Sequence, residues 1–284
     1  MKISGFMILY NAELMGYPFQ ESIQSLLPLV DEMIVAIGDS KDKTKEKILA
    51  LNNPKIRIID TVWDEKNIGG GKILSAKTNE ALLECRNNWC FYLQADEVLH
   101  EKDLENIKTQ LLNYENDTKV EGLHFKYIHF YGSYSVVATS RKWYREEVRI
   151  IKKNSGAQSS GDAQGFKINN KLLKTKSADA TIYHYGWVKP PKIMARKCKL
   201  FHHWWYGDLK DAEFENFYYK KQYGLKKYSG EHPIVMQSLV LSQDWECCYK
   251  RAKFWSNWSD LRLALSDLIE KIIGRQPFQR KVHE

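Results

Sequence analysis

Short apolar segments alternate with helical patterns over residues 1–125. The segments are unbroken and rich in Ile and Val, which predicts strands covered on both faces, as in a mostly parallel sheet. Helical periodicity fills the stretches between the segments and also follows the last one. Repeated β-α-β units of this kind favour an open, doubly wound α/β fold. The expected strands are Ile3–Tyr10, Met33–Ile37, Ile56–Thr61 and Cys90–Gln94, and the expected helices are Glu21–Leu27, Lys43–Leu51, Leu74–Cys85 and one carrying Leu104, Ile107 and Leu111.

The pattern is less regular after residue 125. A stretch rich in Ser, Gly and Gln at Asn154–Gly165 predicts a loop. The last apolar repeat, Leu261, Leu265, Leu268 and Ile272, places one face on a helix that begins near Asn257 and ends at Gly274 and Pro277. The other expected elements are strands at Gly122–Ile128, Ser135–Thr139 and Val148–Lys152 and helices at Lys192–Trp204 and Asp211–Tyr223.

Each of the first four expected strands runs directly into polar residues. In a doubly wound sheet, ligands bind beyond the carboxyl ends of the strands, so these residues predict one shared site. The four polar segments are Tyr10-Asn11-Ala12-Glu13, Gly38-Asp39-Ser40, Trp63-Asp64-Glu65 and Gln94-Ala95-Asp96-Glu97.

The glycines of the chain do not form a phosphate loop. No G-x-G-x-x-G follows the first strand, which argues against a dinucleotide site. The run Gly69–Lys72 is similar to the end of a phosphate loop, but the pattern around it differs. Lys66 stands where that loop needs Gly, and Ile73 stands where it needs Ser or Thr, so a turn is the better interpretation. A carboxylate-rich site without such a loop needs a metal or basic side chains to hold a diphosphate, and oxygen ligands suit Mg²⁺ or Mn²⁺.

Three of these segments, in order, resemble motifs of glycosyltransferase family 2. They are YNAE, VDEMIVAIGDSKDKT and SAKTNEALLECRNNWCFYLQADEVL, the last ending in a D-x-D-type motif. The resemblance covers residues 2–125 and implies an A-type glycosyltransferase fold and inverting transfer from a nucleoside diphosphate sugar. Gln94 replaces the usual first acid; a neutral amide can bond a ribose but is a poorer metal ligand. By position, the resemblance implies that Tyr10, Asn11 and Glu13 line the nucleoside pocket. It also implies that Asp39 accepts a hydrogen bond from a pyrimidine N–H of a UDP or dTDP donor. Lys77 would lie near the diphosphate, and Asp96 would bind Mn²⁺ or Mg²⁺.

Later segments resemble bacterial enzymes of the same family that assemble surface polysaccharides. The segments are TSRKWYREEVRIIKK, SGDAQGF and IYHYGWVKPP. This likeness implies that His184 completes the metal site, although a core histidine is the plain alternative. It also implies that Arg149, Asp162 and Tyr131 face the acceptor. Asp162 is the expected general base, with Glu146 and Glu147 as alternatives and an Asx turn as the structural explanation of Asp162.

The resulting hypothesis is a transferase that moves a sugar onto a hydroxyl of a glycan or lipid-linked glycan. The alternative is a catalytically degenerate glycan- or nucleotide-binding relative, because Gln94 departs from the family motif. A nucleotidyltransferase would need a Gly-rich basic loop after the first strand, and YNAELMGYPF lacks one. We expect a nucleotide-sugar-binding part at 1–125, an acceptor-binding part of the same domain at 126–235 and a basic helical segment at 236–284.

The charge is uneven along the chain. Residues 1–140 hold 15 Lys and Arg against 20 Asp and Glu, whereas residues 141–284 hold 28 against 15. A basic second half that also holds seven of the nine Trp favours an anionic partner, which includes an anionic membrane surface. No nucleic-acid-binding motif accompanies the charge, so no nucleic acid is expected.

The remaining composition bears on location. The sequence contains no run of eighteen apolar residues, so it predicts no membrane-spanning helix. The five cysteines follow no framework spacing, which predicts reduced thiols in the cytoplasm, with contact at the inner face of the membrane as a further expectation. Cys198 and His202 have helical zinc-ligand spacing but lack two further ligands, so we expect no zinc site there.

Overall fold

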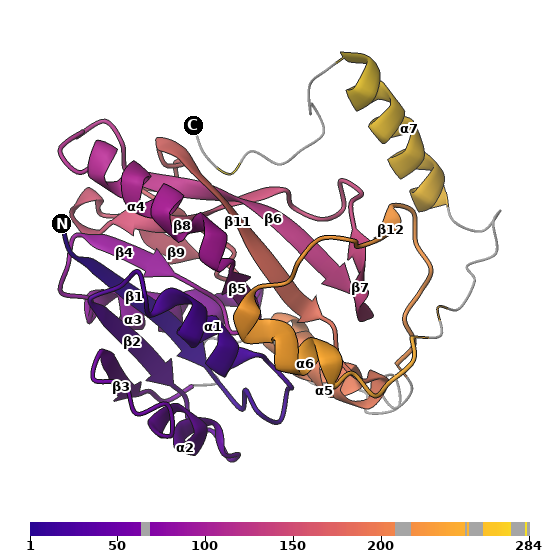
Figure 1. The fold of residues 1–284 in the computed structure, drawn as a ribbon, viewed down its shortest axis with the longest axis horizontal. Coiled ribbons are helices and arrows are strands. Elements are labelled where there is room, and N and C mark those ends of the chain that lie inside the picture. Colours follow the sequence, from indigo (N-terminus) through magenta and orange to yellow (C-terminus); the bar gives the residue numbers. More distant parts are fainter. Residues whose placement is uncertain (64–68, 208–216, 248, 250–257, 274–281, 283–284) are drawn as a thin grey trace.

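The computed structural model describes residues 1–63, 69–207, 217–247, 249, 258–273 and 282. A ten-stranded sheet forms its centre, with strand order β12-β7-β6-β8-β4-β1-β2-β3; in addition, β11 pairs with β6, and β5 pairs with β11 (Figure 1). Helices lie on both faces of this sheet, so the α/β fold class predicted from the sequence is confirmed.

The predicted parallel strands form one half of the sheet. They are β1 (Ile3–Leu9), β2 (Glu32–Ile37), β3 (Ile56–Asp60) and β4 (Trp89–Tyr92), and all their mutual pairings are parallel. Neighbouring residues of β1 enter opposite cores, because Phe6 packs in one buried cluster and Met7 in the other. Both faces are therefore covered, which explains the unbroken apolar segments. The helices of this half are α1 (Phe19–Leu26), α2 (Thr44–Leu49), α3 (Lys72–Leu83) and α4 (Leu104–Asn113), the last preceded by the 3-10 turn η2 (Glu101–Asp103).

Antiparallel strands complete the sheet. β8 (Glu146–Lys152) pairs with β4, and β6 (Gly122–Tyr131), β7 (Ser133–Ala138) and β12 (Leu225–Lys227) follow outward. The long strand β11 (Thr175–Trp187) runs parallel to β6 and antiparallel to the short β5 (Glu97–Leu99). The predicted loop Asn154–Gly165 instead contains the 3-10 turn η3 (Lys153–Ser155) and a hairpin of β9 (Gln158–Ser160) and β10 (Gly165–Lys167).

Two of the three helices predicted in the second half are confirmed. They are α5 (Pro191–Tyr206) and α7 (Trp258–Ile273), and the predicted end of α7 at Gly274 and Pro277 lies outside the described residues. The helix predicted at Asp211–Tyr223 is wrong for residues 217–223, and 211–216 lie outside the described residues. Tyr219 is buried there, and its hydroxyl donates to the Lys189 carbonyl, which holds a non-helical segment against the body. The short η5 (Ile234–Met236) and α6 (Gln237–Leu241) precede α7.

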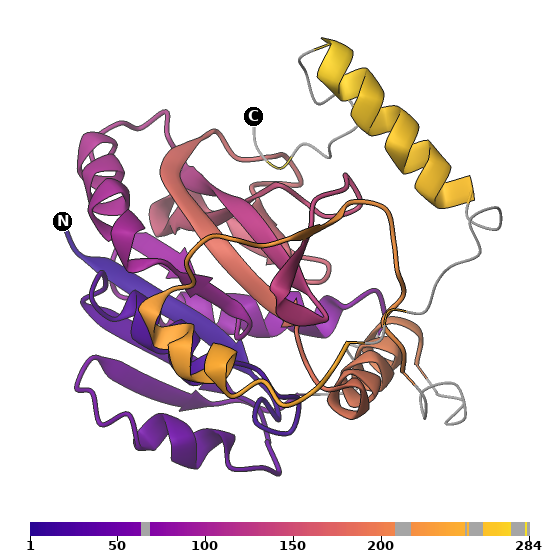
Figure 2. The same ribbon diagram turned by 45° about the vertical axis from the view of Figure 1, so that its right-hand side comes forward.

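Helix α7 stands at the periphery of the molecule, whereas α5 closes one end of the sheet (Figures 1 and 2). Within the described residues, no helix has both the length and the apolar character that crossing a bilayer requires.

Candidate active site

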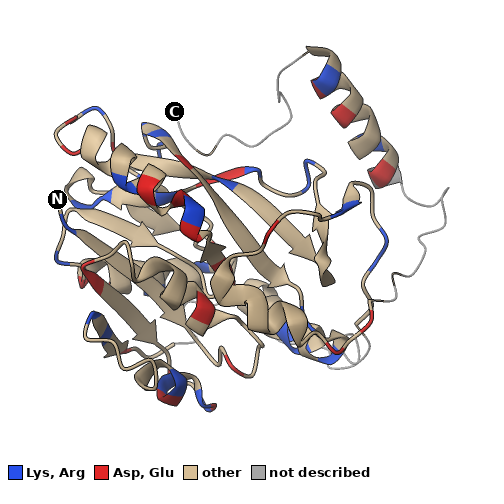
Figure 3. Ribbon diagram, viewed as in Figure 1, with Lys and Arg blue, Asp and Glu red and all other residues tan. Residues whose placement is uncertain are grey.

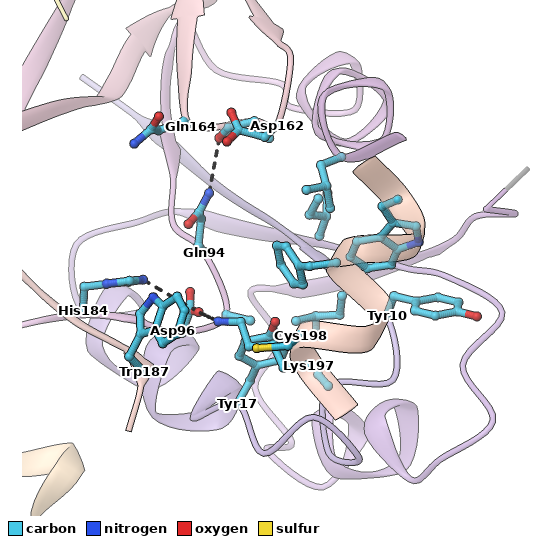
Figure 4. A pocket seen from close by; sticks show the side chains of 18 of the residues that line it. Tyr10, Tyr17, Gln94, Asp96, Asp162, Gln164, His184, Trp187, Lys197 and Cys198 are labelled. Carbon is cyan, nitrogen blue, oxygen red and sulfur yellow. Dashed lines mark hydrogen bonds and ion pairs between the residues drawn. The ribbon is translucent and has the colours of Figure 1, made fainter. Parts of the chain in front are cut away.

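A cavity of about 350 Å³ opens beyond the carboxyl ends of β1 and β4, where the sequence predicted a shared site. The end of β11, the turn between β9 and β10, and α5 form its other walls (Figure 4). The lining side chains used below are Tyr10, Tyr17, Trp63, Gln94, Asp96, Asp162, His184, Lys197 and Trp204.

The predicted nucleoside residues have different positions relative to this cavity. Tyr10 lines it, whereas Asn11 and Glu13 tie two turns together. The Asn11 carboxamide oxygen accepts from the Lys41 backbone N–H at 2.7 Å, and the Glu13 carboxylate accepts from the Lys43 N–H at 3.0 Å. These bonds fix the turn after β1 to the turn after β2.

An aromatic wall closes the cavity next to these turns. The Tyr10 ring stacks on Trp63 at a centroid distance of 4.9 Å, and Trp63 contacts Trp204 of α5 at 5.1 Å. Exposed Asp39 accepts from the Trp63 backbone N–H at 3.4 Å, so its carboxylate lies at the edge of the wall. The predicted neighbours Asp64 and Glu65 lie outside the described residues.

The triple glycine forms a turn, as predicted. Gly69, Gly70 and Gly71 all have positive φ, and the N–H groups of Gly69 and Gly71 donate to the Trp204 carbonyl. A Cβ on Gly71 would lie 2.9 Å from the Cβ of Asp162, so glycine is required where this turn meets the β9–β10 turn.

Asp96 follows β4 and lies beside Lys197 and His184. Its Oδ2 atom is 3.1 Å from the Lys197 Nζ and 3.8 Å from the His184 Nε2. Burial alone would raise the pKa of the Asp96 carboxyl, but Lys197, then His184 and Lys189, hold that pKa below its usual range. Lys197 also donates to the Gly186 carbonyl, and its Nζ lies over the Tyr17 ring. Asp96 is thus an ionised carboxylate paired with Lys197.

A chain of hydrogen bonds sets the tautomer of His184. A carbonyl oxygen can only accept, so the His129 Nε2 donates to the Tyr144 carbonyl at 2.6 Å. Burial first, and the neighbouring His184 second, lower the pKa of His129 to about 3, so the neutral ring must accept at Nδ1. That Nδ1 lies 2.9 Å from the His184 Nδ1, which therefore donates. Burial also lowers the pKa of His184 to about 4, so its Nε2 carries a lone pair on the side of Asp96.

These groups fit a weak divalent-cation site. The His184 Nε2 lone pair and the Asp96 carboxylate converge, and the hydrogen bond that the His184 Nδ1 donates to His129 is the kind of support that orients a ligating histidine. Gln94 adds no charge, and its amide nitrogen donates to the Ala163 carbonyl at 3.2 Å. Among the described residues, no group of three or more His, Cys, Asp or Glu is arranged to hold a metal. The roles of Asp96 and His184 as ligands stay predictions.

Asp162 lies across the cavity from Asp96, with Gln94 between them (Figure 4). It belongs to the β9–β10 turn, where Ala163 has a φ of 59°, an uncommon conformation for a residue with a side chain. The bond from Gln94 to the Ala163 carbonyl holds this turn at the cavity. Glu147, the alternative base, is buried beneath the turn and is not among the residues that line the cavity.

Three residues lie elsewhere than the sequence suggested. Arg149 is fully buried, and its guanidinium binds both carboxylate oxygens of Glu97 at 2.8 and 2.9 Å. It also donates to the Gln164 carbonyl, so it positions the β9–β10 turn instead of facing an acceptor. Tyr131 packs among aromatic rings away from the cavity lining, and Lys77 pairs with Glu80 at 2.6 Å on α3.

The sequence interpretation missed Lys197, Lys189 and His129. Lys197 could have been noticed, because it interrupts an apolar helical stripe that includes Met194, Phe201 and Trp204. His129 stands among aromatic residues in YIHFY, as His184 does in YHY, and the two histidines face each other in the register of β6 and β11.

Solved structures that resemble this chain include complexes with UDP. A structure of S. aureus TarS matches with a TM-score of 0.41 and 13% identity, over 75% of this chain and 41% of that chain. TarS 1-349 in complex with UDP-GlcNAc matches with a TM-score of 0.40 and 13% identity, over 75% of this chain and 69% of that chain. Glucosyl-3-phosphoglycerate synthase from Mycobacterium tuberculosis, in complex with Mn²⁺, UDP and phosphoglyceric acid, matches with a TM-score of 0.32 and 17% identity, over 45% of this chain and 43% of that chain.

The chain thus spans less than half the length of full TarS. No protein-family model matches it, and no curated protein sequence does. The roles proposed below therefore rest on the residues of this chain.

Proposed function

We propose that the chain is a family 2-like glycosyltransferase that moves a sugar, with inversion, from a UDP- or dTDP-type donor to a hydroxyl of a glycan or lipid-linked glycan. The observation that carries the proposal is the division of one cavity. Asp96, His184 and Lys197 form one wall, which is compatible with a metal, and Asp162 faces it from the other side (Figure 4).

The lysines next to Asp96 suit the diphosphate of the donor. Lys197 and Lys189 take the role that the sequence gave to Lys77, because Lys77 is paired on α3 and they surround Asp96. Burial, and then the neighbouring Lys197, lower the pKa of Lys189 well below its ordinary value. Lys197 is the lysine that contacts the Asp96 carboxylate directly, at 3.1 Å. A divalent cation held by Asp96 and His184 would add charge neutralisation of the leaving diphosphate. Because Lys197 binds Asp96 at 3.1 Å, we expect the free protein to bind a metal weakly.

Asp162 is the proposed general base. Its carboxylate takes the proton from the acceptor hydroxyl while the hydroxyl oxygen bonds to the anomeric carbon. The bond from that carbon to the diphosphate oxygen breaks, and its electron pair leaves with the nucleoside diphosphate. Inversion requires base and leaving group on opposite faces of the sugar, and the positions of Asp162 and Asp96 across the cavity suit this requirement.

Replacing the base tests the acceptor half of the proposal. Asp162→Asn should reduce single-turnover transfer by about 10²- to 10⁴-fold and leave nucleotide affinity nearly unchanged. Glu147→Gln is the matched variant, because Glu147 lies close to the same turn without lining the cavity. If transfer survives in Asp162→Asn and is lost in Glu147→Gln, then Glu147 is the general base and Asp162 is not.

A nucleotide panel tests the donor half. Asp39 lies beside the Tyr10–Trp63 wall, where a carboxylate can accept the imide N–H of uracil or thymine. UDP and dTDP should therefore raise the melting temperature more than GDP or CMP, and Asp39→Ala should remove that difference. Equal shifts of the melting temperature from all nucleotides would contradict the assignment of Asp39 to the base.

A second candidate function follows from Gln94, because a neutral amide replaces the usual acid at this position. The chain would then be a relative of these enzymes that binds a glycan or a nucleotide without transferring a sugar. Donor hydrolysis separates the two functions. Slow release of free sugar from the bound donor identifies an enzyme, whereas glycan binding without nucleotide binding identifies the relative.

A further inference from the structure

Helix α7 attaches to the body through its polar face. Ser266 and Glu270 are buried, at 5% and 8% exposure. The Arg141 Nε donates to the Ser266 hydroxyl at 2.6 Å, and the Arg145 guanidinium donates to the Glu270 carboxylate at 2.8 Å. These contacts fix which side of α7 faces the protein.

The apolar face of α7 consequently points outward. Its members recur at i, i+4, i+7, i+8, i+11 and i+12, which places them on one side of a helix. This is the reverse of an ordinary surface helix, which buries its apolar stripe and exposes its polar side. The exposed members are Leu261 at 52%, Leu265 at 52%, Leu268 at 54%, Ile269 at 38%, Ile272 at 75% and Ile273 at 52%.

Two cations of α7 accompany this apolar face. At 100° per residue, Arg262 and Lys271 fall on either side of the midline of the stripe, and both are exposed. Residues 250–284 contain eight Lys and Arg against four Asp and Glu. Two of the four acids, Asp267 and Glu270, are directed to Arg145 of the body.

The body next to α7 is also basic. Tyr223 interacts with Asp267, so the segment that leads to β12 adjoins the helix. Exposed lysines occupy this segment and β12 itself (Figure 3); they are Lys220, Lys221, Lys226 and Lys227. A second copy of the same cationic surface would be repelled, whereas anionic lipid headgroups would be attracted.

We propose that α7 is an interfacial anchor whose Leu and Ile face inserts into the headgroup region of an anionic bilayer. The polar face keeps the body attached, and Arg262, Lys271 and the lysines near β12 contact the lipid phosphates. This combination of an apolar stripe and flanking cations is what binds peripheral helices to membranes. The inference is independent of the proposed transfer, because no residue of α7 lines the cavity.

Vesicle sedimentation of the full chain tests the anchor. The protein should pellet with vesicles that contain phosphatidylglycerol, more weakly with phosphatidylcholine alone, and less as salt rises. Leu265→Ser combined with Leu268→Ser should weaken binding by at least about tenfold. Leu49→Ser combined with Leu83→Ser is the matched control, because those leucines are 62% and 73% exposed on α2 and α3. The control should bind as the unaltered protein does.

Three results would overturn the proposal. The first is equal pelleting by the α7 variant and the unaltered protein. The second is equal binding to both kinds of vesicle at all salt concentrations. The third is an absence of vesicle binding together with a dimer, seen by light scattering, that the α7 variant dissociates; that result would assign the face to a second copy.

Discussion

Helices α5 and α7 have the same length, sixteen residues, and both are amphipathic, yet they present opposite faces to the protein. α5 buries Met194 and Trp204 and carries Lys197 into the cavity. α7 buries Ser266 and Glu270 and leaves the six Leu and Ile side chains of its apolar face exposed. An apolar stripe in the sequence therefore predicts a helix without predicting what the stripe contacts.

The two helices differ in what their charged residues do. Lys197 lies within the apolar stripe of α5, where burial is costly unless a partner is near, and Asp96 is that partner. In α7 the acids lie on the face opposite the stripe, where Arg145 binds them. In these two helices, the buried charge inside the stripe belongs to the cavity, and the acids opposite the stripe attach the helix to the body.

Of the substitutions that compare the two helices, replacement of Lys197 should have the largest effect on transfer. Lys197→Met should reduce transfer by about 10²- to 10³-fold, because a preorganised cation next to the leaving diphosphate is lost. The same change should tighten Mn²⁺ binding without nucleotide, because Asp96 loses its competing partner. Calorimetry with Mn²⁺, with and without UDP, measures this second effect.

Lys192→Met is the matched control on α5, because Lys192 is exposed on the same helix. Lys271→Met is its counterpart on α7 and should leave transfer to a soluble acceptor unchanged. If Lys192→Met were as damaging as Lys197→Met, general charge would matter more than the contact with Asp96. Full activity of the unaltered protein in excess EDTA would leave Lys197 as the cation and remove the metal from the proposal.

The sequence predicted the first half of the fold well because the information there is local. The apolar segments of β1 to β4 lie within a few residues of their observed ends, and the polar residues that follow β4 reach the cavity. Arg149 was misplaced because its partner, Glu97, lies 52 positions away in the chain. The pairing of His129 with His184 depends on the register of β6 and β11, which no local pattern encodes.

The smallest expected effect is on stability, and it tests directly whether the two helices pack differently. Met194 is fully buried on α5, so Met194→Ala should lower the free energy of unfolding by about 2–5 kcal/mol, because it removes packed atoms and leaves a cavity. Leu265→Ala on α7 removes a half-exposed side chain and should change it by at most about 0.5 kcal/mol. Denaturant unfolding of the full chain measures both values.

Leu83→Ala, on an exposed position of α3, gives the baseline for truncating a surface leucine. A loss at Leu265 as large as that at Met194 would mean that the stripe of α7 packs against the protein itself, and the contrast between the two helices would disappear. A loss that matches the Leu83 baseline would leave the stripe free for a bilayer.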